Sequence, residues 1–365
     1  MRVLVVNAGS SSLKLSVIED GRRLQEDSVE RWHGEEHLEP LDEFVTRIGP
    51  VEAVGHRIVH GGPRLTAATL VDDNVLDYLD SVAGLAPLHN PRGIAGVRAA
   101  RRVIGAEPPE VVCFDTSFHA GLPPAASTFA LPREWNSRWS LRRYGFHGLS
   151  HAYAVRQAAK LVGQPLESLR VVSCHVGSGA SLAAVVGGRS VDTTMGFTPT
   201  DGLVMGTRPG SVDPGLLVWL LQHGELTVHE LGEALEHDSG LKGLSGTSGD
   251  LRDVLQARDG GDDHAALAYD VYVHRLIREI GAMAASAGGM DLLVMTGGVG
   301  ENAAVLRSDV VAGLDYLGLA LEQEANEVTT SDGIISAGTA RVPVAVVTAS
   351  EDLEVARETE RLLRG

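Results

Sequence analysis

The sequence predicts an α/β protein built from two related lobes, and two observations support this fold class. Short runs of β-forming residues alternate with Ala- and Leu-rich helical patterns along the chain, as in α/β proteins. In addition, residues 3–17 (VLVVNAGSSSLKLSV) and 171–185 (VVSCHVGSGASLAAV) share one plan: β-formers, one polar residue, a Gly/Ser-rich turn and a second strand. Their polar residues, Asn7 and His175, stand too far apart for a solenoid repeat, so the pattern indicates one duplication.

Hydrophobic patterning places the elements in chain order. Strands are expected at residues 3–6, 13–17, 54–59, 111–114, 171–174, 182–186, 292–296 and 344–348. Helices are expected at residues 93–104, 150–161, 214–222, 265–285 and 351–363. The helix at 214–222 has a favourable N-terminus, because Asp213 can cap it and Pro214 fits its first turn. Three further segments are expected to be a surface excursion (24–42), part of a core helix (216–221) and a solvated loop (259–263).

Length and composition indicate an ordinary soluble protein of two or three domains. The chain has 365 residues, of which 44% are hydrophobic and 22% charged. Its net charge of −17 argues against a nucleic-acid or anionic-membrane partner. No apolar run reaches membrane-spanning length. The two cysteines, Cys113 and Cys174, lie far apart in apolar runs, and this is typical of reduced thiols in the core of a cytoplasmic protein. The lobe boundary is expected near Thr116, with residues 1–116 and 351–365 in one lobe and 117–350 in the other.

The two Gly/Ser-rich turns suggest phosphate binding. Glycine permits positive φ and close approach of the backbone, so such turns can aim N–H groups at phosphate oxygens. Two of them facing each other across a cleft would hold a nucleotide between the lobes, although ordinary hairpin turns are the alternative. The chain has no GxxxxGK[ST] motif, and the turn at residues 297–300 (GGVG) is not a full dinucleotide fingerprint, so hydride transfer is poorly supported.

Several polar residues lie where strands end or glycines cluster. Arg57 and Arg208 both stand beside Gly-rich turns, and their planar guanidinium matches a carboxylate or a phosphate, although a surface ion pair is the common alternative. Asp115 follows an apolar strand and suits Mg²⁺ or its water shell, or else caps a turn. The histidines lack the HExxH or CxxC spacing of a dedicated zinc site, which argues against such a site.

Taken in order, ten segments resemble acetate kinases over nearly the whole chain: NAGSSSLK, GHRIVHGG, LHNP, FDTSFH, YGFHGLSH, HVGSGAS, MGFTP, MGTRPGSVDP, GGVGEN and SEDLEVARET. The resemblance implies the two-lobed fold of actin and the sugar kinases, with ATP and substrate in the interlobe cleft. It also implies ATP/ADP with Mg²⁺ (or Mn²⁺) as cofactors and a cytoplasmic location. The protein is expected to be a homodimer, and the C-terminal lobe is expected to supply both the dimer contacts and the nucleotide contacts.

The resemblance assigns roles to individual residues. It implies that Arg57 and Arg208 act on acetate and the transferring phosphoryl group, that Asp115 is the essential carboxylate, and that His147 stabilises the transition state. Asn7 and Glu351 are expected at the metal, and His89 is an ancillary site histidine. The pocket for the acetate methyl is expected to comprise Val59, Leu88, Phe146 and Pro199. The ATP contacts are expected to comprise Lys14, His175, Gly177, Ser178, Gly179, Gly297, Gly298, Val299, Gly300, Glu301 and Asn302.

One pocket residue can also be argued from spacing. Val59 follows Arg57 by two positions on the expected strand 54–59, so both side chains should point to one face. An arginine that holds the carboxylate would then place the alkyl end of the substrate against Val59.

The chain departs from the usual acetate kinase pattern in three respects. Ser178 replaces an Asn in the second phosphate turn, Gly297–Gly298 stands where Ala–Gly is common, and the chain is short. The expected reaction is reversible phosphoryl transfer from ATP to acetate. A propionate or butyrate kinase with the same machinery, and a non-enzymatic actin-like ATP-gated assembly protein, remain as alternatives.

Overall fold

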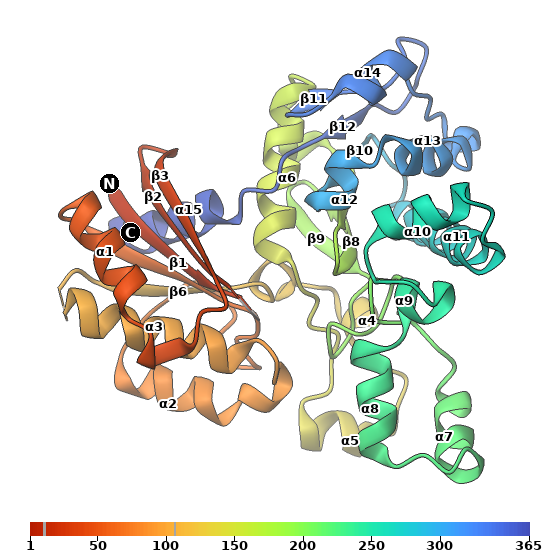
Figure 1. Cartoon of the computed structure of the whole chain (residues 1–365). Coiled ribbons are helices and arrows are strands. Elements are labelled where there is room, and N and C mark those ends of the chain that lie inside the picture. The colour runs from red at the N-terminus through yellow and green to blue at the C-terminus, as the bar shows by residue number, and fades with distance from the viewer. Residues whose placement is uncertain (10–11, 106) are drawn as a thin grey trace. The chain divides into compact units, whose positions relative to one another are not determined.

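The computed structural model describes residues 1–9, 12–105 and 107–365, and they form two compact units (Figure 1). The first unit comprises Met1–Ala120, Phe146–Tyr153 and Ser350–Gly365, and the second comprises Gly121–Gly145 and Ala154–Ala349. Each unit contains one six-stranded sheet. This division differs from the lobe bounds expected from the sequence in that residues 117–120, 146–153 and 350 belong to the first unit.

The sheet of the first unit has the strand order β3-β2-β1-β4-β6-β5. Its strands are β1 (Arg2–Ala8), β2 (Ser12–Glu19), β3 (Arg22–Glu30), β4 (Ala53–Ile58), β5 (Thr69–Leu70) and β6 (Glu110–Phe114). The helices of this unit are α1 (Glu39–Ile48), α2 (Asp73–Ser81), α3 (Asn90–Ile104) and α15 (Glu351–Arg364), and α6 (Gly148–Leu161) begins in it.

Strand β1 is covered on both faces. Leu4 and Val6 pack in a core cluster with residues of α3, while Val3 and Val5 pack in another with residues of α15. A strand buried on both faces has no polar alternation, and this explains the unbroken apolar run at residues 3–6.

The sheet of the second unit has the order β11-β12-β10-β7-β8-β9. Its strands are β7 (Arg170–Val176), β8 (Ala180–Val186), β9 (Arg189–Thr193), β10 (Leu292–Thr296), β11 (Gly333–Ile334) and β12 (Val344–Val346). Its helices are α4 (Pro124–Ser127), α5 (Arg133–Trp139), α7 (Pro214–His223), α8 (Val228–His237), α9 (Gly240–Ser245), α10 (Leu251–Asp259), α11 (Asp263–Ser286), α12 (Gly297–Asn302), α13 (Ala304–Ala312) and α14 (Gln323–Val328). Helix α11 packs on β7, β8 and β9, and α12 lies on β7 and β10.

The two sheets have the same topology, which confirms the predicted duplication. In each, the first strand (β1 or β7) pairs antiparallel with the next strand of its hairpin and parallel with the strand on its other side. Asn7 and His175 are each the last residue but one of that first strand, and each of the two strands has four consecutive buried residues followed by that half-buried polar residue. The repeat of the sequence is therefore a repeat of the whole sheet.

All the predicted strands and helices form, with shifts at several ends. Strand β4 ends at Ile58 rather than Val59, and β12 ends at Val346. Gly297–Asn302, predicted as a turn between a strand and a helix, is itself helical as α12.

The predicted surface excursion at residues 24–42 is wrong in part. Most side chains of β3 are exposed, as expected for a charged strand at a sheet edge. However, Trp32 is buried and its indole N–H donates to the carbonyl of His37 (2.8 Å), and α1 buries Leu41 and Phe44. One side of this segment therefore belongs to the core.

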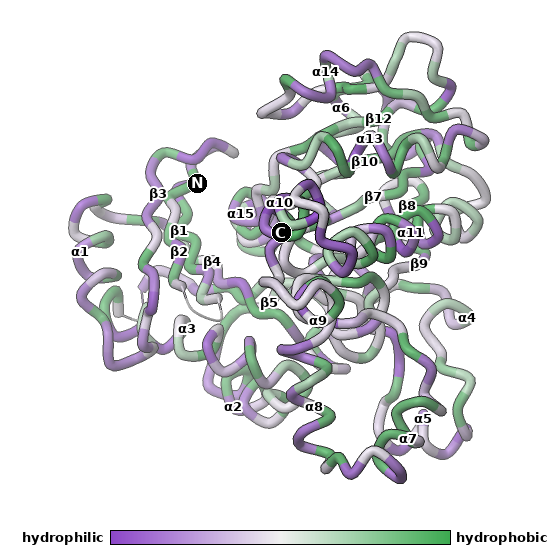
Figure 2. The backbone as a smooth tube through the Cα atoms, turned by 45° about the vertical axis from the view of Figure 1, so that its right-hand side comes forward, coloured by the Kyte–Doolittle hydropathy of each residue, from purple (hydrophilic) through white to green (hydrophobic). Residues whose placement is uncertain are grey.

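The predicted core helix at residues 216–221 is also wrong. These residues form most of α7, but no residue of α7 is buried, and Leu216, Val218 and Trp219 are 47%, 52% and 54% exposed. Figure 2 shows α7 as a hydrophobic segment of the tube. A helix that is apolar on all sides normally lies against other protein, and here the single chain does not cover it.

Both cysteines are buried and free, as predicted. Among the residues that the structure describes, no helix is both long and apolar enough to span a membrane.

Candidate active site

Three predicted site residues of the first unit lie around the guanidinium of a fourth, Arg57. Its Nε and Nη2 donate to Oδ1 and Oδ2 of Asp115 at 3.0 and 2.6 Å, and its Nη1 donates to Oδ1 of Asn7 at 3.3 Å. Glu351 Oε2 lies 3.3 Å from Arg57 Nε. The fold explains the meeting: Asn7 and Arg57 lie near the ends of parallel strands β1 and β4, Asp115 follows β6, and Glu351 begins α15.

Burial and charge act on this cluster in opposite directions. Burial opposes the charge of Arg57, but Asp115 and Glu351 outweigh it and raise the pKa of the guanidinium above its ordinary value. Burial raises the pKa of Asp115 to about 6, against the pull of the Arg57 charge and with help from Glu351. Two carboxyl groups share one guanidinium, so the ionised cluster has a negative excess that suits a cation.

The turn that contains His147 is held against the same strand end. The N–H of Gly148 donates to the carbonyl of Asp115 (2.8 Å), and a Cβ on Gly148 would lie only 2.3 Å from that oxygen. His147 itself has φ of +56°, a left-handed conformation that is uncommon for a residue other than glycine. Such strain persists where the surroundings impose it and is frequent at functional sites.

The predicted acceptor-pocket residues are in different environments. Phe146 is fully buried with its ring edge-on to His60 (5.5 Å between centroids), whereas Leu88 is 43% exposed and His89 beside it is half-buried. Val59 is half-buried and follows the end of β4. Because β4 ends at Ile58, Val59 follows the strand rather than lying on it, and its alignment with Arg57 stays a prediction.

The predicted ATP residues of the second unit adjoin one another. In the turn between β7 and β8, the N–H of Gly177 donates to the carbonyl of Gly179 (3.0 Å). A Cβ on Gly177 would lie 3.9 Å from the nitrogen of Gly298 and 4.0 Å from Nε2 of His175, so this turn faces the start of α12. Gly297 has φ of +80°, and a Cβ there would come within 2.8 Å of the Val176 carbonyl, which only glycine avoids.

Arg208 lies on a loop that contacts this turn. The N–H of Gly206 donates to the carbonyl of Ser178 (3.0 Å), and the Nη1 of Arg208 donates to the carbonyl of Pro199 (2.7 Å). Burial lowers the pKa of Arg208, although Glu236 opposes this. Among the described residues Arg208 forms no salt bridge, so its charge is available to an anionic ligand.

The remaining predicted ATP residues are more dispersed. Lys14 is exposed in the first unit and lies opposite Asn7 in the β1–β2 register, hence on the same face of the sheet. Ser10 and Ser11 of the first phosphate turn lie outside the described residues. In α12, Val299 and Gly300 are partly and fully buried, Glu301 Oε1 accepts the N–H of Ala349 (2.9 Å), and the Asn302 amide donates to the carbonyl of Gly298 (2.8 Å).

The donor set of the first unit fits a magnesium ion. Asn7, Asp115 and Glu351 supply the amide and carboxylate oxygens that hard cations prefer. Within the described ranges no group of three or more His, Cys, Asp or Glu side chains is placed to hold a metal alone. Mg²⁺ rarely needs such a cage, because it keeps several waters and takes oxygens from a bound phosphate.

Comparison with known proteins identifies the family. The sequence model described as the Acetokinase family matches residues 36–357. This chain belongs to the acetokinase family. It is 42% identical to the acetate kinase of Gloeobacter violaceus over the whole length of both chains, and 40% identical to that of Thermotoga maritima, covering 100% of this chain and 99% of the relative.

Solved structures agree with this acetokinase assignment. The acetate kinase of Porphyromonas gingivalis superposes with a TM-score of 0.91 at 34% identity, and a propionate kinase from Francisella tularensis with 0.90 at 33%, each covering 99% of both chains. A ROK hexokinase from Thermus thermophilus matches with a TM-score of 0.50 at 14% identity, covering 100% of this chain and 99% of that one, which shows a shared fold only. The predicted actin-like and sugar-kinase fold is confirmed.

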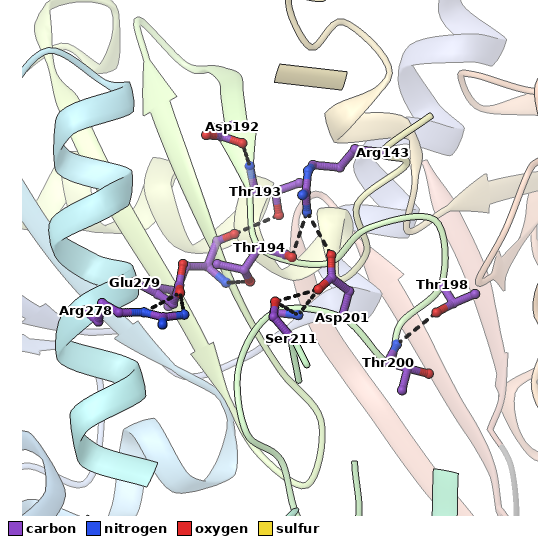
Figure 3. A network of polar contacts seen from close by, with 12 residues as sticks. Arg143, Asp192, Thr193, Thr194, Thr198, Thr200, Asp201, Ser211, Arg278 and Glu279 are labelled. Carbon is purple, nitrogen blue, oxygen red and sulfur yellow. Dashed lines mark hydrogen bonds and ion pairs between the residues drawn. The ribbon is translucent and has the colours of Figure 1, made fainter. Parts of the chain in front are cut away.

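Two groups of residues in this acetokinase chain escaped the sequence analysis. Arg143, Asp201 and Ser211 form a polar network around the loop that contains Arg208 (Figure 3). Although MGTRPGSVDP includes Ser211, no local spacing marks it as a partner of Asp201.

The second group fixes the end of α12. Arg307 is buried, with Nε donating to Oδ1 of Asn326 (2.7 Å) and Nη1 to the carbonyls of Gly300 (3.0 Å) and Glu301 (2.6 Å). A guanidinium beside the unpaired carbonyls at a helix C-terminus is favourable. Only the folded chain brings these partners together.

Proposed function

We propose that this protein reversibly transfers the γ-phosphoryl group of ATP to acetate, giving acetyl phosphate and ADP. The observation that carries the proposal is the Arg57–Asp115 pair in a chain that resembles acetate kinases over its full length. Asp115 and Asn7 take one N–H of each guanidinium nitrogen, so Nη1 and Nη2 each retain an N–H that can donate to acetate or phosphate.

The chemistry needs no general base. A carboxylic acid of ordinary pKa, about 4, is already ionised at neutral pH, so acetate can attack as it is. The obstacle is repulsion between acetate and the phosphates, together with in-line alignment. Arg57 and Arg208 supply positive charge at the acceptor and the transferring group, and His147 donates a hydrogen bond to the developing charge.

The metal and nucleotide complete the proposal. Asn7 and Glu351 hold Mg²⁺, or Mn²⁺ as an alternative, which neutralises phosphate charge when bound. The ATP phosphates lie near Lys14 of β2 and at the turn of residues 177–179, beside His175, with His89 as an ancillary site residue. The adenosine lies along residues 297–302, whose backbone adjoins the second turn.

Val59, Leu88, Phe146 and Pro199 enclose the alkyl end of the acceptor, and acetate is preferred because the pocket is small. A second candidate function is that of a propionate kinase. It is supported by the propionate kinase structure from Francisella tularensis, which resembles this chain about as closely as the acetate kinase structure from Porphyromonas gingivalis does. The two candidates differ only in the size of that pocket.

The protein acts in the cytoplasm as a homodimer, without nucleic-acid or membrane partners. The net charge of −17 supports the absence of polyanionic partners. The exposed apolar surface of α7, centred on Leu216, Val218 and Trp219, supports a second copy of the chain as the partner.

A hydroxylamine trap tests the activity directly. The protein is incubated with Mg²⁺-ATP, acetate and hydroxylamine, which converts an acyl phosphate into a hydroxamate. We expect acetohydroxamate to form in step with ADP and to depend on acetate, and propionate in parallel gives the preference. ADP formation that does not depend on an acid would contradict the proposal and favour an actin-like ATPase.

A further inference from the structure

The loop that contains Arg208 is closed at its base by Asp201. One carboxylate oxygen, Oδ1, accepts both the hydroxyl of Ser211 (2.6 Å) and the N–H of Gly202 (2.8 Å). The Ser211 N–H in turn donates to the Gly202 carbonyl (3.0 Å). Figure 3 shows Asp201 and Ser211 pointing toward each other. Residues 202 and 211 are therefore joined, and Arg208 lies between them in sequence.

The backbone at this base leaves little room for another arrangement. Gly202 and Gly210 have φ of +99° and +70°. A Cβ on Gly210 would come within 2.4 Å of the carbonyl oxygens of Gly202 and Leu203, and one on Gly202 within 2.8 Å of Thr194. The glycines permit the close approach, and the hydrogen bonds of Asp201 select it.

Asp201 is itself anchored from outside the loop. Nη1 of Arg143 lies 3.4 Å from its Oδ2 and donates to the carbonyl of Thr194 (2.8 Å). The Arg143 N–H donates to the carbonyl of Ser127 (2.7 Å), so this arginine is tied to the segment before α5. The side chain of Asp201 is 33% exposed, hence apolar packing does not account for its position.

The position of Asp201 affects Arg208 through Pro199. The Arg208 guanidinium donates to the Pro199 carbonyl, and Pro199 is only two positions before Asp201. No hydrogen bond or ion pair within the described residues joins Asp201 to Arg208 directly. A shift of residues 199–201 would therefore move the oxygen that orients the guanidinium.

We propose that Asp201 is a positioning residue for Arg208, acting with Ser211 and Arg143 but touching no substrate. The inference rests on the proposed function of Arg208 in phosphoryl transfer. The Asp201 carboxylate can lie in the same loop region as Arg208 without repelling an anionic substrate. Its negative charge is offset by the Arg143 charge, the Ser211 hydroxyl and the Gly202 N–H. Misplacement of a catalytic group by about 1 Å can lower turnover on the order of 10²-fold.

A double-mutant cycle tests this inference. We expect Asp201→Ala to lower kcat roughly 10- to 100-fold, Ser211→Ala to lower it less, and the Kd for ADP to remain unchanged in both. In the Arg208→Ala background, adding Asp201→Ala should lower kcat no further, since the group that Asp201 positions is already gone. Losses that multiply in the double variant would overturn the inference, as would full activity of Asp201→Ala.

A matched control separates positioning from general damage. Asp192 in the same unit also accepts a serine hydroxyl, that of Ser286 (2.7 Å), but lies outside the Arg208 loop. Asp192→Ala should leave kcat unchanged, and equal losses in both variants would overturn the inference. If Asp201→Ala fails to fold, Ser211→Ala provides the same cycle. Wild-type protein that forms no acetohydroxamate would overturn the proposed function itself, which is a separate outcome.

Discussion

The half-buried Arg57 and the buried Asp115 are joined by two parallel hydrogen bonds, Nε to Oδ1 (3.0 Å) and Nη2 to Oδ2 (2.6 Å). Arg208, the other arginine of the proposed mechanism, has no such ion pair within the described residues. The two arginines have the same chemical role in the proposal, but Arg57 is paired with a carboxylate and Arg208 is not. Their removal should therefore have similar effects on kcat and different effects on stability.

Arg57→Ala and Arg208→Ala should each lower kcat by roughly 10³-fold or more, as cations at phosphoryl-transfer transition states do, while ADP still binds. Arg57→Ala should also destabilise the protein by about 3–5 kcal/mol, since it leaves the Asp115 carboxyl buried without its partner. Arg208→Ala should leave stability nearly unchanged. Steady-state kinetics, ADP titration and urea unfolding measure the three effects, and near wild-type kcat in either variant would refute its role.

His147→Ala should lower kcat by roughly 10²–10³-fold through loss of a donor to the developing charge. His147→Asn is the matched control for the backbone, because Asn tolerates the φ of +56° well. Both variants should melt close to wild type. A large fall in Tm with unchanged specific activity would instead assign His147 to packing.

Val59→Ala should narrow the ratio of kcat/KM between acetate and propionate, mainly by improving propionate. One methylene in a small apolar pocket is worth about 1–3 kcal/mol, or 10–200-fold. Leu70→Ala serves as the control, since Leu70 is an exposed apolar residue of the same unit. The assignment of Val59 fails if the ratio stays the same or if the wild type prefers propionate.

Trp219→Glu should convert the proposed homodimer into a monomer. The substitution places a charge on α7, where Leu216 and Val218 are also about half exposed. Light scattering coupled to size-exclusion chromatography gives the mass, and Tyr316→Glu, at another exposed position of the second unit, is the control. A wild-type monomer would refute the dimer, and a dimeric Trp219→Glu variant would refute α7 as its interface.

The free energy of unfolding should fall as the pH drops from about 6.5 to 4. Burial lowers the pKa of His119 to about 4, although its hydrogen bond to the Phe146 carbonyl (3.1 Å) opposes the shift. The unfolded chain protonates this histidine first, so its contribution is complete above pH 6.5 and is lost below, by up to about 3 kcal/mol. His119→Gln keeps a side-chain donor and should make the urea-unfolding profile less steep between pH 7.5 and 4.5, while His60, whose pKa burial also lowers to about 4, retains its own contribution. An unchanged profile would contradict the assignment.

Much of the fold could be predicted because its signals are local. Strands β1 and β7 are apolar runs that end in a polar residue and a Gly/Ser turn, and this pattern depends only on neighbours in sequence. Because the pattern recurs, the duplication is visible in the amino-acid sequence alone. Arg57 and Asp115 could be selected for the same reason, since each stands at the end of a strand.

The burial of α7 and the extent of β4 were not predictable in this way. The sequence of α7 is as apolar as a core helix, and whether it is covered depends on which surfaces the rest of the chain supplies. Strand β4 ends at Ile58 because its pairing with β6 ends there, opposite Phe114. Pairing with another strand is a long-range property, so alternation along residues 54–59 could not set the limit.

By itself, the sequence determined the α/β class, the duplication and the family, and it supplied the residues of the candidate site. Those features follow from the order of residues within short segments. Only the tertiary structure decided that Asp115 holds Arg57, that Asp201 and Ser211 close the Arg208 loop, and that Arg307 fixes the end of α12. Each of these contacts joins residues from separate segments, and a hydrogen bond of about 3 Å between them exists only once the backbone has brought both groups to the same place.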